Sequence, residues 1–351
     1  LSRNALSVGA LLFFVILATW LYVVVGLVLS MSYLILAGLF SLIGINLRFY
    51  LSEMGQKTMI RNMFGQYLSP KVVEGLVEDP SKIQLGGEER EMTAYFSDVV
   101  GFTTISENLS PTELVHLLND YLTEMCNIII GYEGTIDKFQ GDAIIAFWGA
   151  PGSQPDHARR ACLASVDMSN RLDELREKWR REGAPELEAR MGLNSGPMVV
   201  GNMGSAQRLD YTIMGDAVNL TARLEGANKA YGSRTMISKS TYDACSDAVD
   251  VRELDRIMVV GKTEPVTVYE LLDRKNQSSS TVADLAAQFG KGLNLYRSGN
   301  FGLAKVEFEN CLKIVATDGP AQTYVQRCQS YIDNPPANDW DGVFTLTEKG
   351  H

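Results

Sequence analysis

A long uncharged segment near the start of the chain constrains its fold more than any other feature. Between Arg3 and Arg48 lie 44 consecutive residues without a charged side chain. As a single helix they would extend roughly 66 Å, about twice the hydrocarbon core of a bilayer. We therefore expect residues 1–50 to contain two transmembrane helices, near 7–27 and 31–48. A signal peptide is disfavoured because its apolar region is much shorter.

The charges around this segment predict its orientation. Arg3 precedes the segment, Arg48, Lys57 and Arg61 follow it, and no basic residue lies between the two expected spans. By the positive-inside rule both ends face the cytoplasm. We expect a multi-pass protein of the inner (plasma) membrane with its remaining chain cytoplasmic. The chain begins with Leu1, and we expect it to be part of a longer protein with further sequence upstream.

Composition excludes some classes of function. The 32 basic and 42 acidic residues give a formal net charge of −10, which argues against a nucleic-acid-binding surface. The five cysteines show neither a CxxC pair nor metal-ligand spacing. We therefore expect them to be reduced thiols in a reducing compartment.

Residues 51–85 are expected to form a helical signalling linker, either a short parallel coiled coil or a plain amphipathic connector. Residues 86–273 alternate strands and helices, which indicates an α+β sandwich with its helices on one face. The expected strands lie near 93–98, 134–139, 143–148, 190–194, 198–200, 209–213, 235–237, 251–260 and 265–272, and the expected helices near 111–130, 156–182 and 216–231.

A polar linker at 276–281 leads into residues 282–335, which we expect to form a helical hairpin with a third helix after Pro320. Its glycines and apolar residues match a single tetratricopeptide-type repeat, although an ordinary helical hairpin explains them equally well. One repeat cannot bury its own apolar face. We therefore expect it to pack on another part of this chain or on a partner protein. Residues 336–351 are a C-terminal tail.

Two carboxylates suggest a metal site. An apolar strand ends at Asp98, and the chain then turns at Gly101 into a loop with free backbone N–H groups. Asp142 follows at the tip of an expected hairpin. If the strands are neighbours, Asp98 and Asp142 can share a pair of Mg²⁺ ions suited to in-line phosphoryl chemistry. Either motif alone would be explained as turn chemistry.

The segment 211–225 adds a strand, a turn and a helix. Asn219 and Arg223 are four residues apart on this helix, so they share one face and can act on one ligand. An arginine suits the charge that develops on a transferring phosphate.

Together, these three segments resemble the catalytic domain of the class III nucleotidyl (adenylate and guanylate) cyclases over 86–273. The resemblance implies a ferredoxin-like α+β domain that works as a head-to-tail homodimer with its sites at the interface. It implies the following roles: Asp98, Asp142 and the Val99 carbonyl for two Mg²⁺ or Mn²⁺ ions, Gly101, Phe102, Thr103 and Lys262 for the triphosphate, Asn219 for the ribose, and Arg223 for the transition state.

Two further positions bear on the choice of base. Lys138 matches the lysine that reads adenine N1, and Thr212 stands where many adenylyl cyclases have Asp. A threonine hydroxyl can accept from the adenine amino group, so the resemblance implies that ATP is converted to cyclic AMP and pyrophosphate. The Thr212 variant resembles the subgroup linked to bicarbonate responsiveness. In the implied homodimer, Asp98 and Asp142 of one chain face the other chain's Lys138, Thr212, Asn219, Arg223 and Lys262.

The order of membrane hairpin, linker and cyclase resembles bacterial receptor-type cyclases with a CHASE2-like sensor. We therefore expect a membrane-anchored adenylyl cyclase that acts in signal transduction. Three alternatives remain: a guanylyl cyclase, a catalytically silent regulatory domain, and a membrane scaffold whose C-terminal helices recruit partners. Lys138 argues against the first, and the intact motif residues argue against the second.

Overall fold

The computed structural model describes residues 3–25, 36, 39–41, 43–52, 54–55, 86–205, 208–258, 264–337 and 340–345. The chain divides into two compact units, Leu1–Pro80 and Ser81–His351. Most of the expected linker at 51–85 lies outside the described residues, and so does Lys262.

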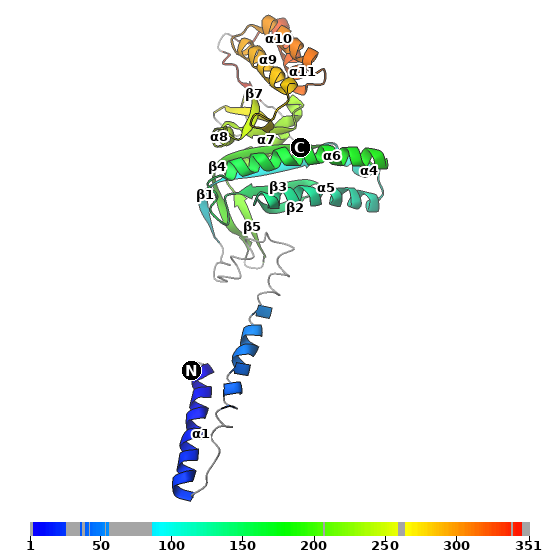
Figure 1. Cartoon of the computed structure of the whole chain (residues 1–351). Helices are drawn as coiled ribbons and strands as arrows, with labels where there is room; N and C mark the ends of the chain where they lie inside the picture. The colour runs from blue at the N-terminus through cyan, green and yellow to red at the C-terminus, as the bar shows by residue number, and fades with distance from the viewer. Residues whose placement is uncertain are drawn as a thin grey trace. The chain divides into compact units, whose positions relative to one another are not determined.

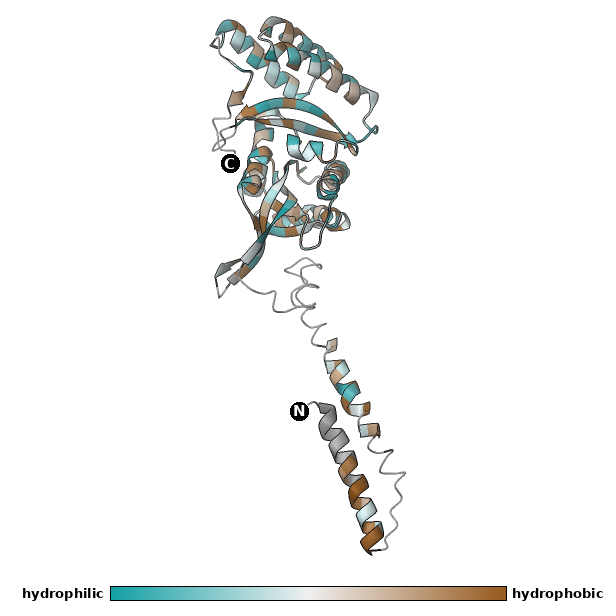
Figure 2. Cartoon of the chain, turned by 90° about the vertical axis from the view of Figure 1, so that its left-hand side faces the viewer, coloured by the Kyte–Doolittle hydropathy of each residue, from teal (hydrophilic) through white to brown (hydrophobic). Residues whose placement is uncertain are grey.

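The first unit contains helix α1 (Arg3–Val25) and further helical residues at 43–52. Large apolar side chains are exposed along the described part of α1, among them Ile16 and Val23. Much of the coloured part of this helix is hydrophobic (Figure 2). Among the described residues, no helix is both long and apolar enough to cross a membrane. The two predicted spans therefore find no support in the described helices, and part of the second falls outside them.

Among the described residues of the second unit, nine strands form one mixed sheet. Figure 1 shows this sheet with its helices. Its strands are β1 (Gly86–Val99), β2 (Thr135–Gln140), β3 (Ala143–Trp148), β4 (Ala189–Ser205), β5 (Arg208–Met214), β6 (Thr235–Ser238), β7 (Val249–Met258), β8 (Val266–Arg274) and β9 (Phe344–Thr345). The order is β2-β3-β1-β4-β6-β8-β7-β9, with β5 also paired to β4. The α+β class is confirmed.

Strand β4 differs from the prediction, which divided it into two strands around Pro197. It pairs with β1 at 189–202, with β6 at 191–193 and with β5 from 199 onward. Pro197 therefore lies where one edge of β4 has no strand partner, and there a residue without an N–H is tolerated.

Helices cover both faces of the sheet, so the prediction of helices on one face is wrong. Alternating β1 side chains point to opposite sides, and both sides are apolar. Tyr95 packs in a core with α5 (Pro111–Gly131) and α6 (His157–Glu182), whereas Ala94 packs with Val218 of α7 (Asp216–Tyr231). Two short helices, α4 (Phe102–Glu107) and α8 (Lys239–Asp243), complete the expected catalytic domain, residues 86–273, which we call the catalytic body.

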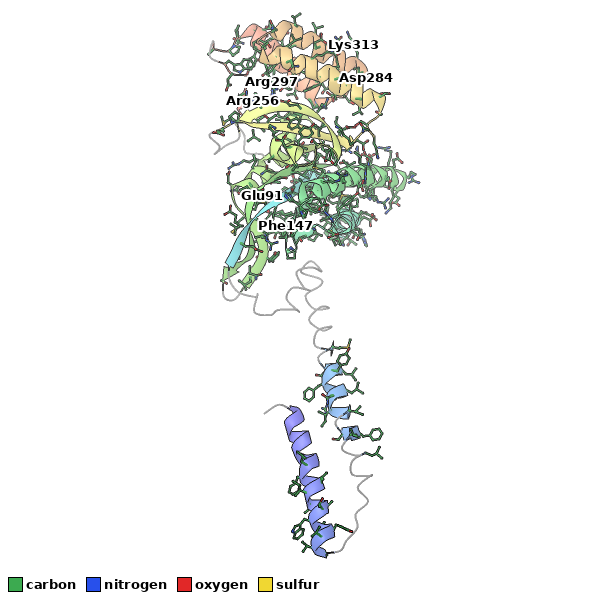
Figure 3. The ribbon with its side chains drawn as sticks, turned by 60° about the vertical axis from the view of Figure 1, so that its left-hand side comes forward. Glu91, Phe147, Arg256, Asp284, Arg297 and Lys313 are labelled. Carbon is green, nitrogen blue, oxygen red and sulfur yellow. The ribbon has the colours of Figure 1, made fainter. Side chains whose placement is uncertain are left out.

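Three helices follow the catalytic body, as predicted: α9 (Ser280–Arg297), α10 (Phe301–Ile314) and α11 (Gly319–Asp333). Their apolar side chains share a core with α7, β6, β7 and β8. Arg297, labelled in Figure 3, forms an ion pair of 2.7 Å with Glu253 of β7. The expected apolar face is thus covered within this chain. The tetratricopeptide-type assignment of these helices stays a prediction.

Candidate active site

The fold brings Asp98 and Asp142 together, as the sequence predicted. Strands β1 and β3 are antiparallel neighbours, and Asp142 follows Gly141, whose φ of 68° makes the tight hairpin turn after β2. The Val99 N–H donates a hydrogen bond of 3.0 Å to Asp142 Oδ2. Burial and the neighbouring Asp142 charge both raise the pKa of Asp98. The two carboxylates therefore lie close enough for their charges to influence one another.

These residues fit a divalent cation. Two carboxylates and the Val99 carbonyl are oxygen ligands of the kind that Mg²⁺ prefers. The electrostatic repulsion that raises the pKa of Asp98 would be relieved by a cation between the carboxylates. Across the described part of the chain, no group of three or more His, Cys, Asp or Glu side chains forms a larger metal cluster.

Two charged residues that the sequence analysis did not single out extend this group. Arg190, opposite Asp98 in the β1–β4 register, places Nη2 3.7 Å from Asp98 Oδ2 and Nε 3.4 Å from Glu225 Oε1 of α7. Burial is the main cause that raises the pKa of Glu225 to about 7, helped by Asp98 and Asp142 and opposed by Arg190. Only strand register could have revealed these contacts, because the residues are far apart in sequence.

Only Val100 and Gly101 separate the end of β1 from the start of α4. Gly101 has a φ of 67°, a left-handed conformation that glycine adopts at little cost, and it precedes the first turn of α4. Phe102 and Thr103 begin that turn. The Phe102 side chain packs against the core of α5 and α6, so only its backbone can serve a ligand there.

Asp137 contacts both residues that are expected to read the base, Lys138 and Thr212. The Thr212 hydroxyl donates a hydrogen bond of 2.6 Å to Asp137 Oδ2, and Lys138 Nζ lies 3.4 Å from Asp137 Oδ1. The Asp137 side chain is 3% exposed, whereas that of Lys138 is 45% exposed. The sequence analysis missed Asp137, although an acid directly before Lys138 was a visible signal.

Helix α7 presents the remaining pair. Asn219 is exposed and Arg223 lies one turn further along, as the spacing predicted. Arg223 Nη1 is buried and has no hydrogen-bond partner among the described residues. A buried guanidinium nitrogen of this kind is suited to an anionic ligand.

Within the described part of this single chain, no hydrogen bond or ion pair joins Asp98 and Asp142 to the group formed by Asp137, Lys138 and Thr212. The described residues therefore form two separate groups, the carboxylate group of Asp98 and Asp142 and the expected base-reading group of Asp137, Lys138 and Thr212.

The α+β fold has a mixed sheet that brings Asp98 beside Asp142, and a helix that carries Asn219 and Arg223. This arrangement is typical of the catalytic domain of nucleotidyl cyclases. Residues 87–272 match the family described as the adenylate and guanylate cyclase catalytic domain. The chain belongs to this family.

Similar curated proteins include adenylate cyclases. Adenylate cyclase 1 of Rhizobium meliloti (strain 1021) is 35% identical over 224 residues, which cover 64% of this chain and 34% of that protein. The adenylate cyclase of Anabaena cylindrica is 32% identical over 216 residues, covering 60% and 41%. This chain thus spans well under half the length of these curated relatives.

Similar solved structures include both adenylyl and guanylyl cyclases. The adenylyl cyclase CyaB from P. aeruginosa is 39% identical with a TM-score of 0.52, and the match covers 56% of this chain and 100% of that one. The guanylyl cyclase Cya2 is 37% identical with a TM-score of 0.51, and the match covers 55% and 97%. Similarity alone therefore does not choose between ATP and GTP.

Proposed function

We propose that this protein is an adenylyl cyclase that converts ATP to 3′,5′-cyclic AMP and pyrophosphate. The observation that carries the proposal is the hydrogen bond from the Val99 N–H to Asp142 Oδ2, which places Asp142 beside Asp98 at the ends of neighbouring strands. Lys138 and Thr212, which lie together on the sheet, support adenine as the base.

Different residues would bind the metal ions, the ribose and the phosphates of ATP. Asp98, Asp142 and the Val99 carbonyl would hold two Mg²⁺ or Mn²⁺ ions, which lower the pKa of the ribose 3′-hydroxyl and neutralise the triphosphate. The remaining roles come from the side chains and backbone of this chain. Asn219 orients the ribose, Arg223 stabilises the charge on the α-phosphate, and Lys262 with the N–H groups of 101–103 binds the triphosphate.

We further infer that the working unit is a homodimer. The carboxylate group and the base-reading group are separate within one chain. The sequence keeps every residue that each group is expected to contain. A head-to-tail pair would bring one chain's Asp98 and Asp142 to the other chain's Lys138, Thr212 and Arg223, and would form two equivalent sites.

Membrane attachment through residues 4–47 is also proposed, with the catalytic body on the cytoplasmic side of the inner (plasma) membrane. The uncharged run and the exposed apolar side chains of α1 support attachment, while the described helices supply no span. Deletion of residues 1–50 should move the protein from the membrane pellet to the supernatant, and a deleted chain that still sediments would contradict this.

The activity is tested by cyclic nucleotide formation from ATP and GTP with Mg²⁺ or Mn²⁺. We expect cyclic AMP from ATP, and a loss of about a hundredfold or more in Asp98→Ala because a cation ligand is removed. Asp247→Ala is the matched control, since that side chain is 75% exposed and paired only with Arg159 among the described residues. Cyclic GMP as the main product would overturn the base assignment, and no product from either nucleotide would favour the silent regulatory domain.

A further inference from the structure

The buried carboxylate of Asp137 contacts both residues that are expected to read the base. Its Oδ2 accepts a hydrogen bond of 2.6 Å from the Thr212 hydroxyl, and its Oδ1 lies 3.4 Å from Lys138 Nζ. Thr212 itself is only 7% exposed. The family resemblance assigned no role to Asp137.

A hydroxyl group alone cannot distinguish adenine from guanine at the six position. It has one donor and two acceptor sites, so it can accept from the adenine amino group or donate to the guanine carbonyl. A carboxylate can only accept. When the Thr212 proton is directed to Asp137, the hydroxyl offers only its lone pairs to another partner.

We propose that Asp137 is a specificity-determining positioning residue that makes Thr212 an obligate acceptor and thereby favours ATP over GTP. This inference rests on the proposed cyclase function and extends it to the choice of base. The adenine amino group donates to the fixed lone pairs, whereas the guanine carbonyl oxygen faces them without a proton between. Asp137 acts through Thr212 and does not itself need to touch the nucleotide.

The contact with Lys138 serves the same selection. An ammonium group has donors and no acceptor, so it suits adenine N1, which accepts, and opposes the guanine N1–H, which donates. The adjacent Asp137 carboxylate attracts this ammonium group and restrains its position. Lys138 and Thr212 then favour a base with an acceptor at N1 and a donor at the six position, which describes adenine and not guanine.

The test compares kcat/KM for ATP and for GTP in the full chain and in Asp137→Asn. An amide can donate as well as accept, so the Thr212 hydroxyl becomes free to reverse. We expect the ATP-to-GTP ratio of kcat/KM to fall by about tenfold, chiefly through a higher KM for ATP. Asp210→Asn is the matched control, because it makes the same change at an exposed position of the same strand as Thr212.

A double-mutant cycle distinguishes the route. In a Thr212→Val background the hydroxyl is absent, so Asp137→Asn should leave the ratio unchanged within about twofold. The pair Asp137→Asn with Thr212→Asp should restore a preference for ATP, since a carboxylate at 212 accepts without an orienting partner and the new amide can donate to it.

Two results would overturn the inference. These are an unchanged ratio in Asp137→Asn, with or without a lower melting temperature, and an undiminished effect in the Thr212→Val background. The last of these would transfer the effect to Lys138. A wild-type chain that forms neither cyclic nucleotide would instead overturn the proposed function, and this inference with it.

Discussion

Single residues around the candidate active site carry more negative than positive charge. Asp98, Asp142 and Glu225 lie within one electrostatic neighbourhood, and Arg190 is the cation that contacts two of them. The Glu225 side chain is 16% exposed, so water screens it only in part. An acid in this position keeps its proton to a higher pH than it would in the unfolded chain.

Glu225 should therefore make metal-free stability depend on pH. Its folded pKa of about 7 exceeds the ordinary value of 4.5. The stabilisation is complete below about pH 4.5 and is lost as the pH rises to about 7, because the unfolded chain releases its proton first. In Glu225→Gln, the fall in unfolding free energy between pH 5 and 8 should be smaller by about 1–3 kcal/mol.

Urea unfolding in EDTA across this pH range measures the effect. Glu174→Gln is the control because that side chain is 65% exposed. The raised pKa of Asp98 acts in the same direction in every variant, so it largely cancels in the comparison. Parallel pH profiles for wild type and Glu225→Gln would show that Glu225 does not hold its proton.

Residue types and local spacing were sufficient to predict that Asp98 lies near Asp142 and that Asn219 and Arg223 share one helix, whereas the roles of these residues stay predictions. Register was not predictable in this way. Arg190 meets Asp98 only because β4 runs beside β1 with one particular offset. That offset follows from the pairing of whole strands, so no local pattern marks Arg190 as a member of the site.

At the scale of elements, the close packing of α7 on β4 positions the Asn/Arg pair. A Cβ atom at Gly192 would lie 2.3 Å from the Glu225 backbone N and 2.6 Å from the Thr221 backbone O. Backbone atoms in a helix cannot move separately, so any side chain at 192 displaces α7 as a unit. The sequence predicted this helix and its bounds, but it did not reveal the face of the sheet that α7 covers.

Gly192→Ala should therefore lower both stability and activity. We expect a loss of about 3 kcal/mol in unfolding free energy, together with reduced cyclic AMP formation as Asn219 and Arg223 shift. Gly196→Ala on the same strand is the control, since its new Cβ would meet only Ala217 Cβ at 3.5 Å. Equal melting temperatures and rates in the two variants would contradict the role of this close contact.

The catalytic body and the C-terminal helices lie in one compact unit, Ser81–His351. Phe289, Phe308 and Tyr324 of α9, α10 and α11 share a buried core with Leu254 of β7. Arg252 of β7, itself buried, donates to both carboxylate oxygens of Asp318, at 3.0 and 2.7 Å. The sequence indicated an apolar helical face in need of a partner. It could not identify that partner, since the covering strands β6, β7 and β8 are brought together by sheet pairing and not by local spacing.

The sequence analysis allowed the C-terminal helices to be a separable recruiting module, and the shared core argues for a different outcome. Removing the Phe308 side chain should cost about 3–5 kcal/mol, because it is fully buried against Phe289 and Tyr324. In Phe308→Ala we expect one cooperative melting transition at lower temperature, with cyclase activity lost in that same transition. Residue 308 lies outside the catalytic motifs, so any loss of activity on heating reports folding rather than chemistry.

Leu303→Ala provides the comparison from the same helix, because that side chain is 62% exposed and its loss should leave the transition within about 0.5 kcal/mol of wild type. Scanning calorimetry and thermal inactivation are measured together on both variants. Two separate transitions in Phe308→Ala, with activity following only the upper one, would show that the helices unfold independently of the catalytic body. A single shared transition means instead that a contact at α9, α10 or α11 changes the stability of the strands and helix that carry the active site.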